Sequence, residues 1–322
     1  MAKTYETSGI SRNKNNTHMG RQPDFASWAR AFLQANEECD TSKPSSLKPC
    51  LYLVSTPIGN LGDMTLRALW ALSGVAAVLC EDTRVTAGLL HHYGIKKPLI
   101  SCHDHNEAAR VEEVIARLSR GESLAFVSDA GTPMISDPGF RLVRAVRQAG
   151  FEAVALPGAS AVLTALAGAG LPTDRFLFVG FLPTKQAARR KAIADVAKVE
   201  ATLVFYESAQ RLAATLADLA HELSPEREAA VGRELTKLYE EMQVDTLGAL
   251  AQAYADKEKP KGEIVILVGP PVEAEKETAF DLDKALTEAL VTMSVRDAVA
   301  VVTKASGLKK SEVYARALVI AG

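Results

Sequence analysis

Short apolar runs alternate with amphipathic stretches between residues 50 and 169. Each run has the length of a buried strand, and the stretch after it places apolar residues at helical spacing. The predicted strands are 50–55, 75–80, 98–101, 123–127 and 153–156. The predicted helices are 66–72, 86–93, 106–119, 140–148 and 161–169. This alternation predicts an α/β domain with a mostly parallel, twisted sheet covered on both faces, so ligands should gather at the carboxyl ends of the strands.

The alternation continues to residue 268 and predicts a second α/β domain. Its predicted strands are 176–180, 202–206, 228–234, 241–245 and 263–268. Its predicted helices are 187–196, 211–223 and 247–254. We therefore place the two domains at 50–157 and 158–272, and we expect a ligand site in the cleft between them.

The two ends of the chain lie outside this alternation. Residues 1–49 form an extension whose polar start, 1–24, is predicted to be disordered. The rest of the extension reads as a short amphipathic helix at 25–38 and a linker at 41–49.

Beyond a second linker at 270–278, the pattern predicts a small helical module at 278–322 that resembles a helix-turn-helix. Its three short helices are expected at 282–292, 295–305 and 311–318. Ser294 and Ser311 are the expected N-caps, and Gly307 marks a turn.

The composition is that of a globular protein without a general affinity for nucleic acid. The 322 residues are 48% hydrophobic and 24% charged, with a net charge of −2, so any basic surface must be local. Four cysteines without CxxC spacing indicate reduced thiols in a cytoplasmic protein: Cys39, Cys50, Cys80 and Cys102. No apolar run reaches transmembrane length and the start lacks the apolar core of a secretion signal, so we expect no membrane association.

The loop at 128–139 is the most informative segment of the chain. It follows a predicted strand and precedes a predicted helix, and two prolines restrict its shape. Gly131 allows close approach of a ligand to the backbone, while Asp129 and Asp137 supply hydrogen-bond acceptors. The alternative is an acidic turn that only caps the next helix.

Four other polar loops follow predicted strands, at 56–63, 81–84, 205–208 and 232–237. The first is not a GxGxxG fingerprint, and no acidic residue ends the second strand in the arrangement that a nicotinamide ribose needs, so a dehydrogenase is disfavoured. Loop 81–84 sets two carboxylates beside a guanidinium, which fits either a substrate site or charge pairing at a helix N-terminus.

Seven segments together resemble the tetrapyrrole-methylase superfamily: 51–69, 80–90, 128–139, 157–183, 205–212, 233–241 and 262–269. Within this superfamily they resemble the branch that methylates the ribose of small-subunit ribosomal RNA. Gly131-Thr132-Pro133 matches the family's Gly-Asp-Pro cofactor loop, and the threonine in place of the acidic residue favours the RNA branch. The resemblance implies two α/β domains that clasp S-adenosylmethionine in a cleft, usually as a homodimer.

The resemblance also implies which residues contact S-adenosylmethionine. In the first half of the chain they are Pro57, Ser128, Asp129, Ala130, Gly131, Thr132, Pro133, Ile135, Ser136, Ser160 and Ala161. In the second half they are Tyr206, Glu207, Arg233, Glu234, Leu235, Gly262, Glu263 and Ile264.

The implied reaction transfers a methyl group to the ribose 2′-oxygen of a cytidine in 16S ribosomal RNA, either as free RNA or in the small ribosomal subunit. Because a 2′-hydroxyl is a weak acid, a nearby proton acceptor should help. The first candidates for this chemistry are Glu81, Asp82 and Arg84, followed by Glu207 and Lys237. No metal is required, and His103 and His105 are more typical of hydrogen-bonded loop residues than of bases.

The expected RNA contacts are polar or basic: Asn60, Arg84, Lys237, Lys304, Lys309 and Lys310. The last three cluster at the turn of the C-terminal module, where they can reach phosphates. A packing or dimerisation role for the module is the alternative.

Two other functions fit parts of the sequence. A C-methyltransferase of tetrapyrroles, acting on corrin or sirohaem precursors, is disfavoured by the altered glycine-rich loops and by the C-terminal module. A non-catalytic RNA-binding assembly protein is disfavoured by the intact Gly131-Thr132-Pro133 loop.

Overall fold

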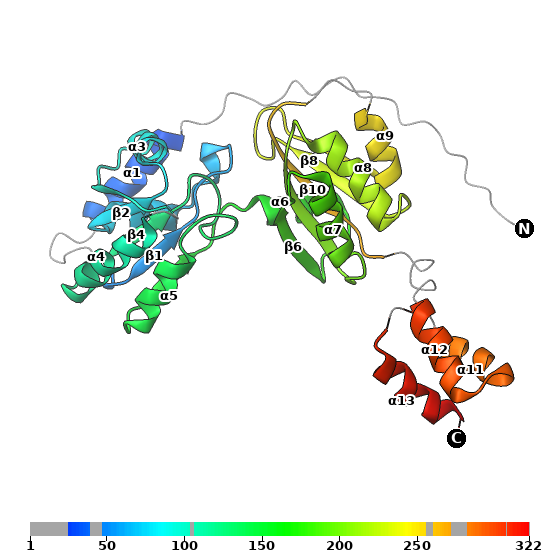
Figure 1. Cartoon of the computed structure of the whole chain (residues 1–322). Coiled ribbons are helices and arrows are strands. Elements are labelled where there is room, and N and C mark those ends of the chain that lie inside the picture. The colour runs from blue at the N-terminus through cyan, green and yellow to red at the C-terminus, as the bar shows by residue number, and fades with distance from the viewer. Residues whose placement is uncertain are drawn as a thin grey trace, which may run out of the picture. The chain divides into compact units, whose positions relative to one another are not determined.

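A computed structural model describes residues 25–38, 47–103, 106–255, 260–271, 282–306 and 308–321. The chain divides into two compact units, Met1–Ser160 and Ala161–Gly322, which we describe separately (Figure 1). Several predictions lie outside the described residues: the disorder of 1–24, most of both linkers, His105, Cys39 and Gly307.

The first unit contains a five-stranded, fully parallel sheet, in agreement with the sequence pattern (Figure 1). Its strands, in the spatial order β3-β2-β4-β1-β5, are β1 (Leu51–Val54), β2 (Ala77–Cys80), β3 (Leu99–Ser101), β4 (Leu124–Val127) and β5 (Ala153–Leu156). The helices of this unit are α1 (Phe25–Glu38), α2 (Leu66–Gly74), α3 (Thr83–His92), α4 (Glu107–Ser119) and α5 (Phe140–Gln148), with a 3-10 turn η1 (Leu61–Asp63).

Side chains that alternate along the central strands build an apolar layer on each face of this sheet. Leu51 and Leu53 of β1 pack in a cluster with residues of α4 and α5. Tyr52 and Val54, the alternate positions of the same strand, pack in a cluster with residues of α1, α2 and α3. Helices therefore cover both faces, as the βα alternation predicts.

The second unit contains a mixed sheet in which β6 and β7 are parallel and the other pairs are antiparallel. Its strands, in the order β6-β7-β10-β8-β9, are β6 (Phe176–Phe181), β7 (Thr202–Ser208), β8 (Glu228–Arg233), β9 (Glu241–Thr246) and β10 (Glu263–Val268). Its helices are α6 (Ala161–Ala169), α7 (Gln186–Val196), α8 (Leu212–Leu223) and α9 (Leu247–Ala255). One apolar cluster joins the sheet to α7, α8 and α9, while α6 packs against β8, β9 and β10.

The C-terminal module is a three-helix bundle with an apolar core of its own. Its helices are α11 (Leu282–Thr292), α12 (Val295–Ser306) and α13 (Lys310–Ala321). The core residues are Leu286, Val299, Val302, Val313 and Ala317. Ser294 caps α12 as predicted, because its hydroxyl accepts from the Asp297 amide at 3.3 Å. The N-cap prediction for Ser311 is wrong, because α13 already begins at Lys310 and the Lys309 carbonyl accepts from the first turn.

The three cysteines that the structure describes are not joined in disulfides. Cys50, Cys80 and Cys102 are buried and unpaired, and burial raises the pKa of each, that of Cys102 to about 11. In the part of the chain that the structure describes, no helix has the length and apolar character needed to cross a membrane.

Candidate active site

The loop after β4 is tied to the ends of β1 and β5 by buried hydroxyl groups. Thr56 and Gly131 exchange backbone hydrogen bonds of 2.9 and 3.0 Å, and the Thr56 hydroxyl donates to the Ser128 carbonyl at 3.1 Å. The Thr132 hydroxyl lies 3.0 Å from that of Ser55 and donates to the Ala159 carbonyl at 3.1 Å. The carboxyl ends of three strands therefore hold the predicted cofactor loop in one shape.

Several residues in this loop have positive φ values, which are unfavourable for residues other than glycine. Gly131 has φ 77° and Gly139 has φ 123°, whereas Met134 and Ser136 adopt φ values of 70° and 67° without being glycine. Each such non-glycine residue costs on the order of 1 kcal/mol, and outliers of this kind cluster at functional sites. Ala130, Ile135 and Ser136 are exposed, so a ligand can reach the loop.

The charged loop 81–84 begins α3. Asp82 is the N-cap: its carboxylate accepts from the Arg84 amide at 2.8 Å and pairs with the Arg84 guanidinium at 2.6 Å. This contact with Arg84 lowers the pKa of Asp82 to about 2. The Asp82 amide in turn donates to the Asp129 carboxylate at 3.1 Å, which joins this loop to the cofactor loop. An acid with so low a pKa is a weak proton acceptor, so Asp82 fits a positioning role better than that of a base.

Asp137 is the acid at this sheet edge that the sequence did not single out as a base. It is partly buried, and burial together with the nearby charge of Glu81 raises its pKa to about 6. Asp129 raises this pKa further, while a hydrogen bond with Ser128 lowers it. Glu81 itself is exposed. A pKa near the working pH is what general-base catalysis favours.

In the second unit, Glu207 is an anchor of the fold. Its side chain is 3% exposed, and its two oxygens accept from the Ser208 amide at 2.8 Å and from the Thr215 hydroxyl at 2.7 Å. The Arg211 guanidinium lies 3.3 Å from the same carboxylate. These contacts hold β7 to the start of α8. They leave Glu207 poorly placed to receive a proton from a substrate.

Lys237 is likewise engaged within the second unit. Its ammonium lies 2.7 Å from the Glu234 carboxylate and 2.9 Å from that of Glu263. Glu234, with φ 50°, packs so closely on Gly262 that a Cβ at Gly262 would come within 2.4 Å of it. Together with the Arg233–Glu241 pair at 3.0 Å, these contacts fix the ends of β8 and β10.

The other predicted site residues differ in accessibility. Tyr206 packs edge-on against Phe178 and Phe181, with ring centroids 4.9 and 5.5 Å away. Leu235 and Ile264 are buried, so they can offer a ligand mainly their backbone. In the first unit, Asn60 accepts from the Gly62 amide at 2.9 Å and so caps η1.

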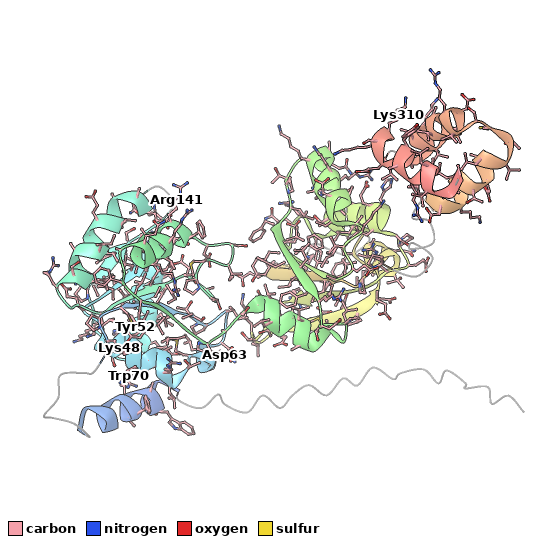
Figure 2. All side chains as sticks on the ribbon, turned by 90° about the horizontal axis from the view of Figure 1, so that it is seen from below. Lys48, Tyr52, Asp63, Trp70, Arg141 and Lys310 are labelled. Atoms are coloured by element: carbon pink, nitrogen blue, oxygen red, sulfur yellow. The ribbon has the colours of Figure 1, made fainter. Side chains whose placement is uncertain are left out.

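The predicted site residues therefore fall into three groups. The first is the carboxyl edge of the parallel sheet, with Pro57, the 81–84 loop, the 128–136 loop and Ser160. The second is the set of loops at β7, β8 and β10. The third is the exposed lysine cluster between α12 and α13: Lys304, Lys309 and Lys310 (Figure 2 labels the last).

Comparison with known proteins identifies the family to which this chain is similar. The family model "Tetrapyrrole (Corrin/Porphyrin) Methylases" matches residues 50–251, and the model "RsmI C-terminal HTH domain" matches residues 277–321. The protein named ribosomal RNA small subunit methyltransferase I from Mesorhizobium japonicum is 47% identical over 84% of this chain and 92% of its own length. The proteins of that name from Pasteurella multocida and Escherichia coli O157:H7 are each 43% identical; this similarity covers 84% and 83% of this chain and 97% and 94% of theirs.

Solved structures show the same fold at low sequence identity. A cobalt precorrin-4 methyltransferase superposes with a TM-score of 0.51 at 18% identity, over 68% of this chain and 94% of its own. A diphthine synthase superposes with a TM-score of 0.53 at 15% identity, over 68% of this chain and 89% of its own. At this identity the likeness establishes the architecture and leaves the substrate to other evidence.

Proposed function

The chain belongs to the tetrapyrrole methylase family, and from that premise we propose that it is an S-adenosylmethionine-dependent methyltransferase of small-subunit ribosomal RNA. The observation that carries this proposal is the joint presence of a methylase core at 50–251 and an RsmI-type C-terminal domain at 277–321. Relatives that share most of the chain are named for this reaction. The acceptor is the ribose 2′-oxygen of a cytidine in 16S ribosomal RNA.

The proposed cofactor contacts include loops of each unit, as the family resemblance implies. The 128–136 loop fits S-adenosylmethionine, because it is fixed by three strand ends yet exposes Ala130, Ile135 and Ser136. These side chains offer apolar and hydroxyl surface to an adenosyl group. A Cβ at Gly131 would lie 3.3 Å from Ile58 Cγ2, so a side chain there would crowd Ile58. Loops 205–207, 233–235 and 262–264 are the cofactor contacts proposed in the second unit.

When bound, the cofactor supplies an electrophilic methyl group on a sulfonium centre. The residues of the chain then have to align the ribose and accept the proton of its 2′-hydroxyl. Glu81 and Asp137 are the acids best suited to that step, since one is exposed and the other titrates near neutral pH. Arg84, whose side chain is 88% exposed, contacts a phosphate, and Asp82 orients Arg84.

Incubation with methyl-labelled S-adenosylmethionine tests the function directly. The acceptors are purified small subunits, free 16S ribosomal RNA and uroporphyrinogen, and the labelled nucleotide is mapped by ribonuclease digestion and mass spectrometry. Label on a cytidine ribose of the RNA is the expected result. Label on the tetrapyrrole would instead assign the C-methyltransferase. RNA binding without transfer to any acceptor would assign an assembly role.

The proposal includes a homodimer that works in the cytoplasm. The family resemblance motivates the dimer, and sedimentation of the purified chain measures it.

A further inference from the structure

Helix α5 presents a basic, aromatic face that neither the cofactor site nor the C-terminal module uses. Leu142 and Val146 are fully buried and attach the helix to the sheet. On the outer side, Arg141, Arg144 and Arg147 are exposed, three residues apart and so on one face of successive turns (Figure 2 labels Arg141). The helix contains three arginines and no acidic residue, so it is strongly basic although the net charge of the chain is −2.

The Phe140 side chain lies on the solvent side of the helix, at the start of this face. The preceding Gly139 has φ 123°, and a Cβ there would meet the Phe126 ring at 2.3 Å. This close packing on a buried ring fixes where the helix begins, and it leaves the Phe140 side chain 67% exposed. Exposure of a large ring is costly in water, so a partner that covers it would gain binding free energy.

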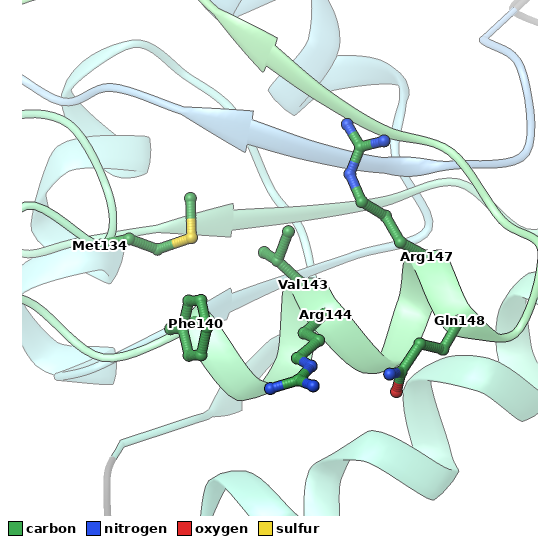
Figure 3. A pocket seen from close by; sticks show the side chains of 6 residues that line it. All are labelled: Met134, Phe140, Val143, Arg144, Arg147 and Gln148. Carbon is green, nitrogen blue, oxygen red and sulfur yellow. The ribbon is translucent and has the colours of Figure 1, made fainter.

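A surface hollow of about 410 Å³ lies beside Phe140, within the size range of small-molecule sites. Figure 3 shows its lining, which consists of Met134 from the cofactor loop and five residues of α5: Phe140, Val143, Arg144, Arg147 and Gln148. The lining is therefore mainly apolar, and two of the residues that contribute to it are arginines.

The acids of α4 that are engaged elsewhere do not neutralise the face. On α4, which packs against α5, Glu107 is buried and accepts from the Leu142 amide at 2.8 Å, while Glu113 pairs with Arg110 at 2.7 Å. Arg147 donates to the Ala153 carbonyl at 3.2 Å. Within the described part of the chain, the structure gives no ion pair to any of the three arginines of α5. Three such charges on one face suit a polyanion.

We infer that this face of α5 binds a single-stranded segment of the ribosomal RNA next to the target nucleotide. An unpaired base stacks on Phe140 in the hollow, and backbone phosphates bind Arg141 and Arg144. The 128–139 loop runs directly into α5, so RNA held here lies at the entrance to the candidate site. The inference rests on the proposed function and adds to it a second RNA contact, separate from the C-terminal module.

A double variant, Arg141→Gln with Arg144→Gln, removes the proposed phosphate contacts and spares Arg147, which has a structural hydrogen bond. The control, Arg175→Gln with Lys191→Gln, removes two exposed positive charges from the second unit. Binding of purified small subunits is measured by filter binding over a series of salt concentrations. We expect the test variant to bind about tenfold more weakly, with a salt slope reduced by about one to two, and the control to match the wild type.

Phe140 is tested by Phe140→Ala and Phe140→Trp. Loss of the ring should weaken binding roughly tenfold, and tryptophan should restore it, because an indole also stacks on a base. For all variants, the affinity for S-adenosylmethionine should stay unchanged by calorimetry. The RNA concentration for half-maximal rate should rise, while the rate at saturating RNA stays within about twofold.

The possible failures are distinguishable. Wild-type protein that neither binds nor methylates the small subunit refutes the proposed function. Wild-type binding combined with unchanged affinity and salt slope in the arginine variant refutes only the role of α5. A variant that becomes monomeric in sedimentation would assign the face to a second copy of the chain and overturn the inference.

Discussion

At the scale of single residues, two carboxyl groups near one sheet edge have opposite environments. Asp82 is bound by the Arg84 guanidinium, and its pKa lies at about 2. Asp137 is partly buried beside the charge of Glu81, and its pKa lies at about 6. Environments that separate the pKa values of neighbouring acids allow one to stay ionised while the other exchanges a proton.

Asp137→Asn should change both activity and stability in a pH-dependent way. Because the pKa in the folded chain is above the ordinary 3.8, the folded state keeps a proton that the unfolded state releases between about pH 4 and 6. The ionised side chain thus destabilises the fold above pH 6. We expect the amide to raise the free energy of unfolding by about 1–2 kcal/mol at pH 8, with little effect at pH 4. Urea titrations at both pH values measure this difference.

The same variant should lower the methylation rate by roughly one to two orders of magnitude and remove the rise in rate around pH 6. Asp245→Asn, an exposed position on β9, is the matched control. A stability gain with an unaltered pH–rate profile would show that Asp137 is buried but takes no part in the reaction.

Arg84→Ala should lower turnover more than cofactor affinity. The hydrogen bond from the Arg84 side chain is the largest cause of the depressed pKa of Asp82, so its removal lets that pKa rise toward the ordinary value and frees the carboxylate. If Arg84 positions the RNA, the rate falls by roughly two orders of magnitude, as expected also for alanine at Glu81 or Asp82. Full activity in these variants, with unchanged S-adenosylmethionine affinity, would show that the loop only caps α3.

Gly131→Ala tests the cofactor loop against a control with the same backbone conformation. Gly131 and Gly121 have φ values of 77° and 82°, so a methyl group strains both. At Gly121 no atom lies within 4 Å of the added carbon, whereas at Gly131 the Ile58 side chain lies at 3.3 Å. We expect calorimetry to show at least tenfold weaker S-adenosylmethionine binding for Gly131→Ala alone. Equal affinities in the two variants would exclude close contact at Gly131.

At the scale of elements, the C-terminal module is the part most nearly independent of the rest. Its three helices share a core that includes Leu286, Val299 and Val313, and Arg316 of α13 pairs with Asp283 of α11. The lysines at its α12–α13 turn are exposed. A small bundle that closes its own core is able to serve as a docking element without contributing to the chemistry.

Deletion of residues 278–322 should therefore leave S-adenosylmethionine affinity unchanged and raise the RNA concentration needed for half-maximal rate by at least tenfold. The full-length variant Lys304→Gln, Lys309→Gln, Lys310→Gln should show the same direction of change with a reduced salt slope. Calorimetry and rate measurements over a salt series check both. Loss of cofactor affinity or of the dimer upon deletion would make the module a structural support.

At the scale of the whole molecule, each unit buries a core of its own, so thermal unfolding should show more than one transition. Glu207→Ala should lower the transition temperature of the second unit by several degrees, because the buried Thr215 hydroxyl loses its hydrogen-bond acceptor. Glu226→Ala, at an exposed position nearby in sequence, should leave it unchanged. S-adenosylmethionine should raise the transition temperature of each unit that supplies cofactor contacts. A shift confined to the first unit would contradict the contacts proposed for loops 205–207, 233–235 and 262–264.

The sequence by itself determined the order and type of the elements. The bounds of α5, α6 and β5 coincide with the predicted ones, because hydrophobic periodicity and turn residues are local properties of the chain. The loop at 128–139 and the family were recognisable for the same reason: the glycine, prolines and aspartates occur in one short segment.

Only the tertiary structure decided the pairing in the second sheet and the state of its charged residues. Three of its four strand pairs are antiparallel, and Glu207 and Lys237 are held by partners from other elements. The pKa of Asp137 depends likewise on Glu81, which belongs to a different strand end. Strand direction, burial and charge pairing join residues distant in the chain, and their energies depend on distances that exist only once the chain has folded.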